Sequence, residues 1–565
     1  MAPTPYQVTF ATVVELETAV EDLTKGAAHW ATLGLPERIA LLQRTHRCTA
    51  DAAQEWAGAA VAAKGTPLGP WEGEEWISGP YAALAGLGAA VQSLSLIAEG
   101  RSPLDGVRSG RAPGERTKFI VMPANPLEWT LFHGFTGEVW LEPGITADRA
   151  RADAGLGAKR LGENGGVGLV LGAGNISAIG PLDVLYELVA YNRVSILKLN
   201  PTFGSLLGAY EKAFAPLIEA NLLRIVNGGA EVGSHLTAHA GIDHVHITGS
   251  GITHDLIVWG SSADKTGAPK LDKPITSELG GVSPVIVIPG RWSEADLRYQ
   301  AEQIATQRLQ NSGHNCIATQ IVILSGDWPQ KQEFLAELRR VLDTLPKRES
   351  WYPGTDRKLT AATTSYPEAE VHAGRLLVEV TDTTSQDLFT TEYFGPVLGH
   401  TTLPGIGSEF FRAAVEFANT RLDGTLGASI AVAPADRRAM GREFDEILAA
   451  LHYGSIGVNV WSAIAFLGAP FTWGAYPGNT LDDVGSGIGV VHNSHLIADT
   501  ERSVIYGPFR PFPRSVLHGE ASLFPKPPWF VTAKTAKSTN QRLTRFAAAP
   551  SWFKLPGIFG DAFRG

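Results

Sequence analysis

Cysteine is almost absent from this chain, since only Cys48 and Cys316 occur among its 565 residues. Two cysteines so far apart in sequence exclude a disulfide framework and favour a reducing compartment. The first residues also lack a basic segment followed by an apolar one, so no secretory signal peptide is indicated. We therefore predict a cytoplasmic protein.

Positive charge is scarce as well: the net charge is −10 and the isoelectric point about 5.9. No strongly basic face is implied, which argues against a nucleic-acid partner. Two runs, 165–182 and 447–481, contain no charged residue, but Gly, Pro and Asn interrupt both. A spanning helix needs about 20 mostly apolar residues, so we interpret both runs as buried or ligand-lining segments.

The chain is too long for one ordinary core, and its patterning predicts two α/β units. Residues 1–115 repeat apolar positions at helical spacing. From residue 165, apolar runs alternate with helical segments: runs at 167–171, 194–199, 223–227 and 244–248, with helices at about 181–191 and 206–220. This rhythm predicts a parallel sheet whose ligand binds at the carboxyl ends of the strands.

A second α/β segment follows residue 290, with helices at 293–310 and 328–344 and strands at 320–324, 376–380 and 428–432. The tail, 511–565, is rich in proline and aromatic residues and has little periodicity. It carries eight basic and two acidic residues. We interpret it as an extended arm that packs on its own or a neighbouring subunit, with contact to an anionic membrane as the sharper alternative.

Several motifs occur in one fixed order. They are GAGNISAIGP (172–181), KLNP (198–201), HITGS (246–250), SELGGVSP (277–284), QNSGHNC (310–316), TEYFGPVLG (391–399) and VNVWSAIAFLGAPF (458–471). Their order and spacing, over about residues 30–500, closely resemble the aldehyde dehydrogenase superfamily. The resemblance implies a Rossmann-like cofactor domain, an α/β catalytic domain and an oligomerisation hairpin, and an enzyme that oxidises aldehydes.

The resemblance also implies the catalytic residues. Cys316 matches the family's nucleophile, and a thiolate suits the task because a thiohemiacetal carbon is a good hydride donor. Asn175 matches the asparagine that stabilises the oxyanion, together with the backbone N–H of Cys316. Glu278 matches the general base that activates water against the thioester. Because this glutamate is present, the resemblance favours release of a free carboxylic acid.

The cofactor implied is NAD or NADP. The residues that match the family's cofactor contacts are Lys198, Gly249, Ser250, Leu279, Glu392 and Phe394. Pro201 replaces the acidic residue that holds the ribose hydroxyls, which removes one barrier to NADP. His254 replaces the last glycine of the G-S-x-x-x-G turn near the pyrophosphate.

The aldehyde pocket is expected near Asn459 and Trp461, by match to the family's V-N-x-aromatic segment, and an apolar small-molecule aldehyde is the expected substrate. No metal is expected. His235 and His239 have i, i+4 spacing, but the glutamate of H-E-x-x-H is missing between them.

The resemblance sets the expected boundaries. They are 1–127 and 165–288 for the cofactor domain, 128–164 and 485–510 for the oligomerisation element, 289–460 for the catalytic domain, 461–484 for a return to the cofactor domain and substrate pocket, and 511–565 for the arm. A homodimer or dimer of dimers is implied.

Three alternatives remain open at this point. The first is a dehydrogenase that passes the acyl group to coenzyme A, with Glu278 serving another purpose. The second is reduction of an activated acid as the working direction. The third is a catalytically silent family member that acts as a binding protein, which the departures at Pro201 and His254 motivate.

Overall fold

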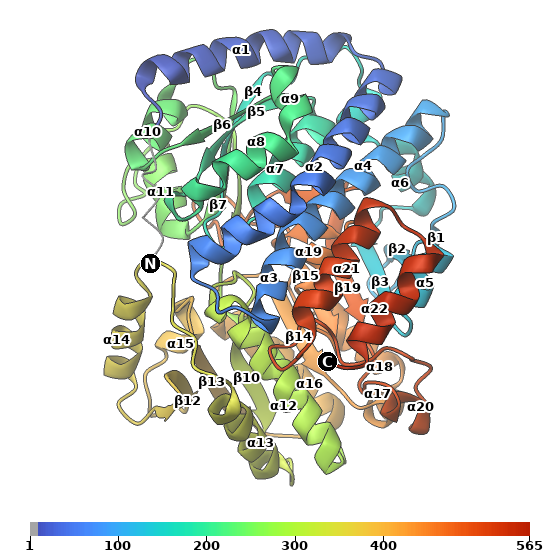
Figure 1. Ribbon diagram of the computed structural model, residues 1–565. Helices are drawn as coiled ribbons and strands as arrows, with labels where there is room; N and C mark the ends of the chain where they lie inside the picture. Colours follow the sequence, from blue (N-terminus) through green and yellow to red (C-terminus); the bar gives the residue numbers. More distant parts are fainter. Residues whose placement is uncertain (1–9) are drawn as a thin grey trace.

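The computed structural model describes residues 10–565, and two β-sheets organise them (Figure 1). The smaller sheet has six strands in the order β17-β8-β7-β4-β5-β6. Their bounds are β4 (Val167–Leu171), β5 (Val194–Leu199), β6 (Leu223–Asn227), β7 (His244–Gly249), β8 (Ile275–Leu279) and β17 (Gly487–Ile488). All neighbours are parallel except β17 and β8. The four apolar runs predicted as strands are therefore confirmed.

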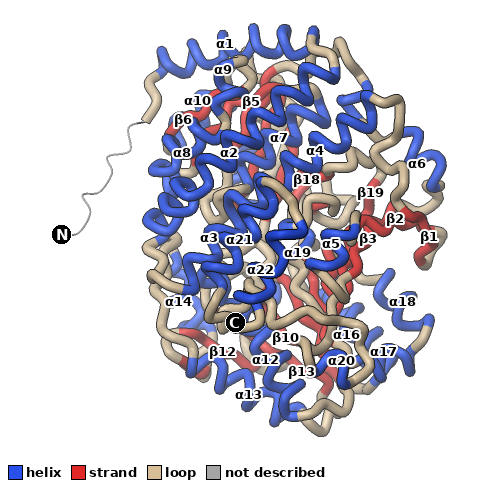
Figure 2. Tube along the Cα trace, turned by 45° about the vertical axis from the view of Figure 1, so that its right-hand side comes forward, coloured by secondary structure: helices blue, strands red, loops and turns tan. Residues whose placement is uncertain are grey.

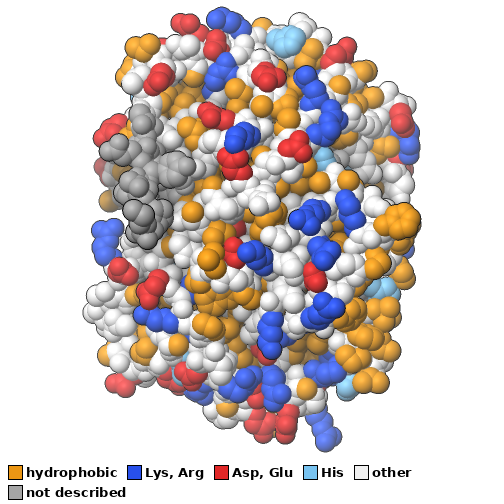
Figure 3. Space-filling view, in the orientation of Figure 1, with side chains coloured by type: hydrophobic (Ala, Val, Ile, Leu, Met, Phe, Trp, Pro, Cys, Tyr) orange, Lys and Arg blue, Asp and Glu red, His pale blue; other side chains and the backbone are white. Residues whose placement is uncertain are grey.

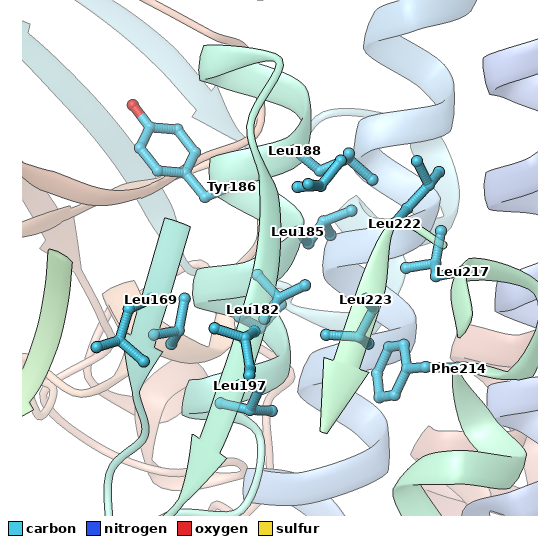
Figure 4. Packing of buried hydrophobic residues seen from close by; sticks show 14 of the residues in the cluster. Leu169, Leu182, Leu185, Tyr186, Leu188, Leu197, Phe214, Leu217, Leu222 and Leu223 are labelled. Carbon is cyan, nitrogen blue, oxygen red and sulfur yellow. The ribbon is translucent and has the colours of Figure 1, made fainter. Parts of the chain in front are cut away.

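Helices cover both faces of this sheet, which explains why most residues of its parallel strands are buried. The helices are α1 (Val13–Thr32), α2 (Leu35–Lys64), α4 (Ala82–Ala98), α7 (Ile179–Tyr191), α8 (Leu207–Ala213), α9 (Ala215–Glu219), α10 (Ala230–Ala238) and α11 (Gly251–Trp259). Leu182 and Leu185 of α7 lie close to Leu197 of β5 in the core (Figure 4). The single helix predicted at 206–220 is instead two helices that meet at Phe214, because Pro216 has no N–H to continue the first one.

The larger sheet has eleven strands in the order β1-β2-β3-β19-β15-β14-β9-β10-β13-β12-β11 and occupies the lower half of Figure 1. Their bounds are β1 (Arg108–Ala112), β2 (Arg116–Met122), β3 (Thr136–Leu141), β9 (Ser283–Val287), β10 (Thr319–Ser325), β11 (Glu370–His372), β12 (Arg375–Glu379), β13 (Val397–Leu403), β14 (Gly427–Ala431), β15 (Ser455–Val458) and β19 (Thr500–Tyr506). The strands from β19 to β12 are parallel, and the outer ones are antiparallel.

The remaining helices pack mainly around this larger sheet or join it to the smaller one. They are α3 (Gly73–Trp76), α5 (Pro126–Leu131), α6 (Ala147–Asp153), α12 (Glu294–Leu309), α13 (Lys331–Thr344), α14 (Thr355–Ser365), α15 (Asp387–Thr390), α16 (Gly407–Arg421), α17 (Pro434–Met440), α18 (Arg442–Ala449) and α19 (Ile464–Leu467). A short hairpin of β16 (Thr472–Gly474) and β18 (Val490–Asn493) lies beside β19. The helices predicted near 293–310 and 328–344 correspond to α12 and α13.

Two of the expected domain boundaries differ from the sheets that the structure forms. Strand β9, which the boundary at residue 288 assigns to the cofactor domain, pairs with β10 and β14 in the larger sheet. Strands β1 and β2, assigned to the same domain, also extend the larger sheet. Backbone pairing therefore places the division between β8 and β9. The sequence of a strand does not by itself show which sheet it joins, because either sheet would satisfy its backbone hydrogen bonds.

The C-terminal arm is not simply extended, as the weak periodicity suggested. It forms α20 (Arg514–Leu517), α21 (Ala536–Ala548) and α22 (Leu555–Ala562). Helix α21 packs against α3, α2 and the turn at Ile77–Tyr81, and both views show it lying across them (Figures 1 and 2). The arm thus packs on its own chain. The sequence pattern did not indicate α21, because the buried face of this helix carries Thr539, Asn540 and Thr544 as well as apolar residues.

Part of the arm leaves apolar side chains at the surface. Phe553 is 95% exposed and Leu517 76% exposed, while Trp129 of the nearby α5 is 55% exposed. Hydrophobic side chains gather towards the right of the face drawn in Figure 3, where the arm and α5 lie. Contact of this region with a membrane or a second subunit stays a prediction.

One helical run, Pro70–Ala98, has the length and hydropathy to cross a membrane. It is interrupted at Gly79, whose backbone is not helical, and Pro80 follows. Its last part, α4, packs against α2, α7 and α21. The run is thus covered in part by helices of the same chain.

Candidate active site

The carboxyl ends of the parallel strands of the smaller sheet face a cleft of about 860 Å³, which lies between the two sheets. Most of the predicted site residues line this cleft: Asn175, Lys198, Gly249, Ser250, Glu278, Cys316, Glu392 and Phe394. Its volume lies in the range of about 300–1,000 Å³ that is usual for small-molecule sites. The structure therefore brings together residues that lie between positions 175 and 394 of the chain.

Two predicted site residues, Leu279 and Asn459, line neither this cleft nor the smaller cavity that adjoins Cys316. Leu279 is buried within β8, and its backbone N–H donates to the carbonyl of Ser486. Asn459 uses both ends of its amide on the backbone of Val432, at 2.8 and 2.9 Å. The assignment of Asn459 to the substrate pocket is therefore corrected: this side chain ties β15 to β14, and Trp461 lies at the pocket.

A strained turn presents Cys316. Asn311 and Ser312 have φ of 54° and 57°, the left-handed region that costs most residues energy. The Asn311 amide donates to the carbonyls of Asn175 and His314, each at 3.0 Å. Asn311 also accepts a hydrogen bond from the ammonium of Lys64 at 3.1 Å. Asn311 therefore helps to join Asn175 to the turn that carries Cys316.

The ammonium of Lys64 is fully buried, which sequence reasoning did not anticipate. It forms an ion pair with Glu75 at 2.9 Å, and both side chains are 0% exposed. Arg348 pairs with the adjacent Glu74 at 2.6 Å. Buried charges persist only when they are paired and hydrogen-bonded, so these ion pairs fix the position of the Lys64 ammonium. Because Lys64 donates to Asn311, the cluster also holds the Asn311 turn in place. No local pattern signals it, because Lys64 ends a helix of ordinary composition.

Cys316 and Glu278 line the same part of the cleft and affect the ionisation of each other. Burial raises the pKa of Glu278 to about 7, although the hydrogen bond from the Cys316 thiol opposes that rise. Removal from water and the nearby Glu278 charge raise the pKa of the Cys316 thiol well above its usual range. The indole of Trp473 also donates to Glu278, at 3.4 Å. A thiol beside a carboxyl that titrates near neutrality can serve nucleophilic and general-base chemistry.

A second cavity, of about 50 Å³, adjoins Cys316. Its wall is mostly apolar and aromatic, formed by Ile77, Ile176, Ile179, Ile317, Trp461, Ala463, Phe466, Leu467, Trp473 and Trp529. Asn175, Glu278 and Cys316 line both this cavity and the large cleft. Cys316 therefore stands where two separate spaces meet.

Two tryptophans of the pocket wall were not named from the sequence: Trp473, although it lies in the segment 461–484 that was expected at the substrate pocket, and Trp529. Trp473 lies inside the uncharged run 447–481, which was interpreted as buried or ligand-lining, so a signal existed for it. Trp529 belongs to the arm, where no motif pointed to a site.

The far part of the large cleft offers polar groups to an elongated anionic ligand. Ser250 caps α11, whose N-terminus opens into the cleft and favours negative charge. Lys198 ends β5 in the same cleft, and burial lowers its pKa. His254, which replaces the family's glycine, is fully buried beside Asp255 and so does not block this N-terminus.

Glu392 lies near the junction of the cleft and Cys316. Burial raises its pKa to about 7, and its Oε1 atom has no hydrogen-bond partner among the described residues. A Cβ at position 280 would lie 2.3 Å from Glu392 Oε2, so only the glycine found there admits this carboxyl. An unsatisfied buried oxygen beside a cleft is an acceptor available to a ligand hydroxyl.

The histidines His235, His239 and His246 lie apart from one another or at the surface. His235 and His239 both contact Glu17, at 3.3 and 2.9 Å, on the surface, while His246 faces Asp183 in the interior at 3.6 Å. Within residues 10–565, no group of three or more His, Cys, Asp or Glu is arranged to hold a metal ion.

Comparison with known proteins identifies similar sequences. Residues 202–358 match the model of the aldehyde dehydrogenase family. The chain is 29% identical over 279 residues to the chloroplastic betaine aldehyde dehydrogenase of Amaranthus hypochondriacus, which covers 45% of this chain and 50% of the relative. It is 27% identical over 158 residues to the dimeric NADP-preferring aldehyde dehydrogenase of Rattus norvegicus, covering 28% and 32%. The chain thus spans half or less of the length of these relatives.

Solved structures show the same fold. The crystal structure of a gamma-glutamyl-gamma-aminobutyraldehyde dehydrogenase from Burkholderia cenocepacia superimposes with a TM-score of 0.60 at 18% identity, over 88% of this chain and 89% of the other. An NADP-dependent glyceraldehyde-3-phosphate dehydrogenase from Bacillus halodurans, solved with NADP, gives a TM-score of 0.57 at 18% identity, over 87% and 91%. The predicted two-unit α/β fold is confirmed.

Proposed function

We propose that this chain is a member of the aldehyde dehydrogenase superfamily that oxidises an apolar aldehyde to a carboxylic acid with NAD or NADP as acceptor. One observation carries the proposal. Asn175, Glu278 and Cys316 line both the large cleft and the small apolar cavity. An elongated cofactor and a small aldehyde can therefore reach the same sulfur from different sides.

The reaction follows from these three side chains. The Cys316 thiol releases its proton to solvent as its sulfur attacks the carbonyl carbon, a C–S bond forms, and the carbonyl electrons move to oxygen. Asn175 Nδ2 has one N–H on the His314 carbonyl at 3.0 Å, which leaves its second N–H for that oxyanion. The backbone N–H of Cys316 is the second proposed donor.

A bound nicotinamide cofactor supplies the acceptor for the hydride that the same carbon loses, and a thioester on Cys316 remains. Glu278 then takes a proton from water as the water oxygen attacks the thioester carbon. The C–S bond breaks, the sulfur leaves as thiolate, and the carboxylic acid is released. Because the buried Glu278 titrates near 7, it can hold and return a proton at physiological pH.

The cleft fits the cofactor proposed for it. Lys198 and the N-terminus of α11 would hold its anionic half, and the unsatisfied Oε1 of Glu392 would accept a ribose hydroxyl. Pro201 stands where an acidic residue would repel a 2′-phosphate. This arrangement supports use of NADP as well as NAD.

The test is an assay of the full-length chain with NAD or NADP, a panel of short, long and aromatic aldehydes, and no coenzyme A. We expect reduced cofactor and free acid in equal amounts. Silence until coenzyme A is added would replace this proposal with acyl transfer to that thiol. Silence with coenzyme A as well would favour a binding protein without catalysis.

Replacing Lys198 tests the cofactor site separately. Lys198→Met keeps the length of the side chain but removes its charge. Because a hydrogen bond to a charged group contributes about 1.5–3 kcal/mol, we expect the KM for cofactor to rise about tenfold to a hundredfold. The increase should be larger for NADP than for NAD, since a 2′-phosphate adds negative charge.

Steady-state kinetics with both cofactors measure this effect. Lys212→Met is the matched control, because Lys212 is exposed and pairs with Glu55 at the surface. Equal KM values in the Lys198 variant and the wild type would remove Lys198 from the cofactor site.

A further inference from the structure

We propose that the C-terminal arm determines which aldehydes reach Cys316, because Trp529 of the arm forms part of the wall of the small apolar cavity. This inference rests on the proposed function and extends it to substrate selection. It assigns the arm a role at the active site of its own chain.

The position of Trp529 supports this role. It lines the same cavity of about 50 Å³ as Cys316, Glu278 and Asn175. Its side chain is only 6% exposed, so it is a wall of the interior rather than a surface residue. A cavity this small beside the reacting sulfur leaves little space for a long or branched substrate. More space can come only from a smaller or displaced residue of the cavity wall.

Aromatic packing holds the Trp529 ring in place. Phe524 and Phe135 lie 6.0 and 6.3 Å from it between ring centroids. The next residue, Phe530, stacks on Tyr299 of α12 at 5.3 Å. Tightly packed interiors resist displacement, so a longer substrate cannot simply push the indole aside.

Polar contacts fix the backbone that carries Trp529. The N–H of Val531 donates to Thr306 Oγ1 at 3.2 Å, and the carbonyl of Val531 accepts from the Trp71 indole at 3.3 Å. Lys526 pairs with Glu302 at 3.1 Å. Thr306 and Glu302 lie on α12, the helix that leads into the Cys316 turn. The wall and the nucleophile therefore share one support.

The chain on both sides of this segment is anchored as well. Before it, Arg510 pairs with Asp296 at 2.8 Å. After it, Asn540 of α21 donates to the carbonyl of Gly73 at 3.0 Å, and Lys537 pairs with Glu72 at 2.7 Å. Such fixation at both ends favours a permanent wall over a flap that opens.

The experiment compares Trp529→Ala with the wild type on straight-chain aldehydes of increasing length. One buried methylene contributes about 0.8 kcal/mol, which is about fourfold in kcat/KM. We expect kcat/KM for the longer aldehydes to rise by about this factor per added methylene, while the KM for cofactor stays unchanged. Trp529→Leu, which keeps an apolar side chain, should shift the profile in the same direction by less.

Trp552→Ala is the matched control, because this arm tryptophan is 55% exposed and does not line the cavity. It should leave the length profile unchanged. An unchanged profile in both Trp529 variants, with both folded as judged by thermal unfolding, would overturn the proposal.

A second readout separates this inference from the proposed function. Alkylation of Cys316 by N-alkyl iodoacetamides of increasing alkyl length needs no aldehyde oxidation. We expect the ratio of long-chain to short-chain alkylation rates to rise at least about tenfold in Trp529→Ala. A raised ratio in a chain that oxidises no aldehyde would support the wall and reject the function. If the chain forms acid but Trp529→Ala changes the dependence on chain length in neither readout, the proposed function would be supported and the role of Trp529 as a cavity wall would be rejected.

Discussion

Cys316→Ala should lower the rate of acid formation by about 10⁴- to 10⁶-fold, because removal of a catalytic nucleophile removes the covalent route altogether. Neither Asn175 nor Glu278 can replace the sulfur, since only a nucleophile can form the adduct that releases hydride. The substitution removes one sulfur atom from a position between two cavities, so we expect the fold to persist.

The chain offers a matched control for this variant. Cys48 is its only other cysteine and lies on α2, away from the cleft. Cys48→Ala should keep full activity, whereas Cys316→Ala should still bind cofactor with wild-type affinity. Substantial acid formation by Cys316→Ala would show that the reaction does not pass through this sulfur.

Glu278→Gln should separate the two halves of the reaction. Loss of a positioned general base typically lowers a rate by about 10²- to 10⁴-fold, and here the loss should fall on hydrolysis of the thioester. We expect one equivalent of reduced cofactor in a fast first phase, followed by almost no turnover. Mass spectrometry of the intact chain should then find the acyl group on Cys316.

Two additions sharpen this result. Hydroxylamine, a neutral nucleophile that needs no base, should restore turnover of Glu278→Gln by releasing the acyl group. Glu379→Gln, at an exposed position of β12, should behave as wild type. A variant that lacks the first phase, or that turns over normally, would contradict the assignment of Glu278 as base for hydrolysis.

The Glu278→Gln variant also tests which group controls the dependence of kcat on pH. Glu278 must be a carboxylate to accept a proton, and burial raises its pKa to about 7, so wild-type kcat should rise with pH through about 7. Glu392 has its pKa raised to about 7 by burial as well. If ionisation of Glu278 causes this rise of kcat with pH, the rise should be absent in Glu278→Gln. A rise that persists in this variant would belong to another group such as Glu392.

Much of the fold could be predicted because its central strands are defined locally. The runs at β4, β5 and β7 are mostly buried, since parallel strands are covered on both faces, and their concentration of Val, Ile and Leu shows in the sequence itself. Their motif residues then fall at the carboxyl ends, where ligands bind in such sheets. Lys198 and Gly249 are at these ends in the structure.

Some features could not be predicted because their signal is not local. The buried face of α21 mixes apolar residues with Thr539, Asn540 and Thr544, so apolar periodicity did not reveal it. The amide of Asn459 resembles a pocket residue in its motif, yet both of its ends bind the Val432 backbone. Such a choice depends on which groups meet after the chain has folded.

The sequence by itself determined the proposal for the chemistry: which side chains we propose as nucleophile, base and oxyanion donor, and on which strand ends and turns they stand. Those properties follow from residue type and local backbone preference. The tertiary structure alone decided that Lys64 supports the Asn311 turn and that Trp529 closes the cavity beside Cys316. Both contacts join residues more than 200 positions apart, and burial, not local pattern, is what stabilises them.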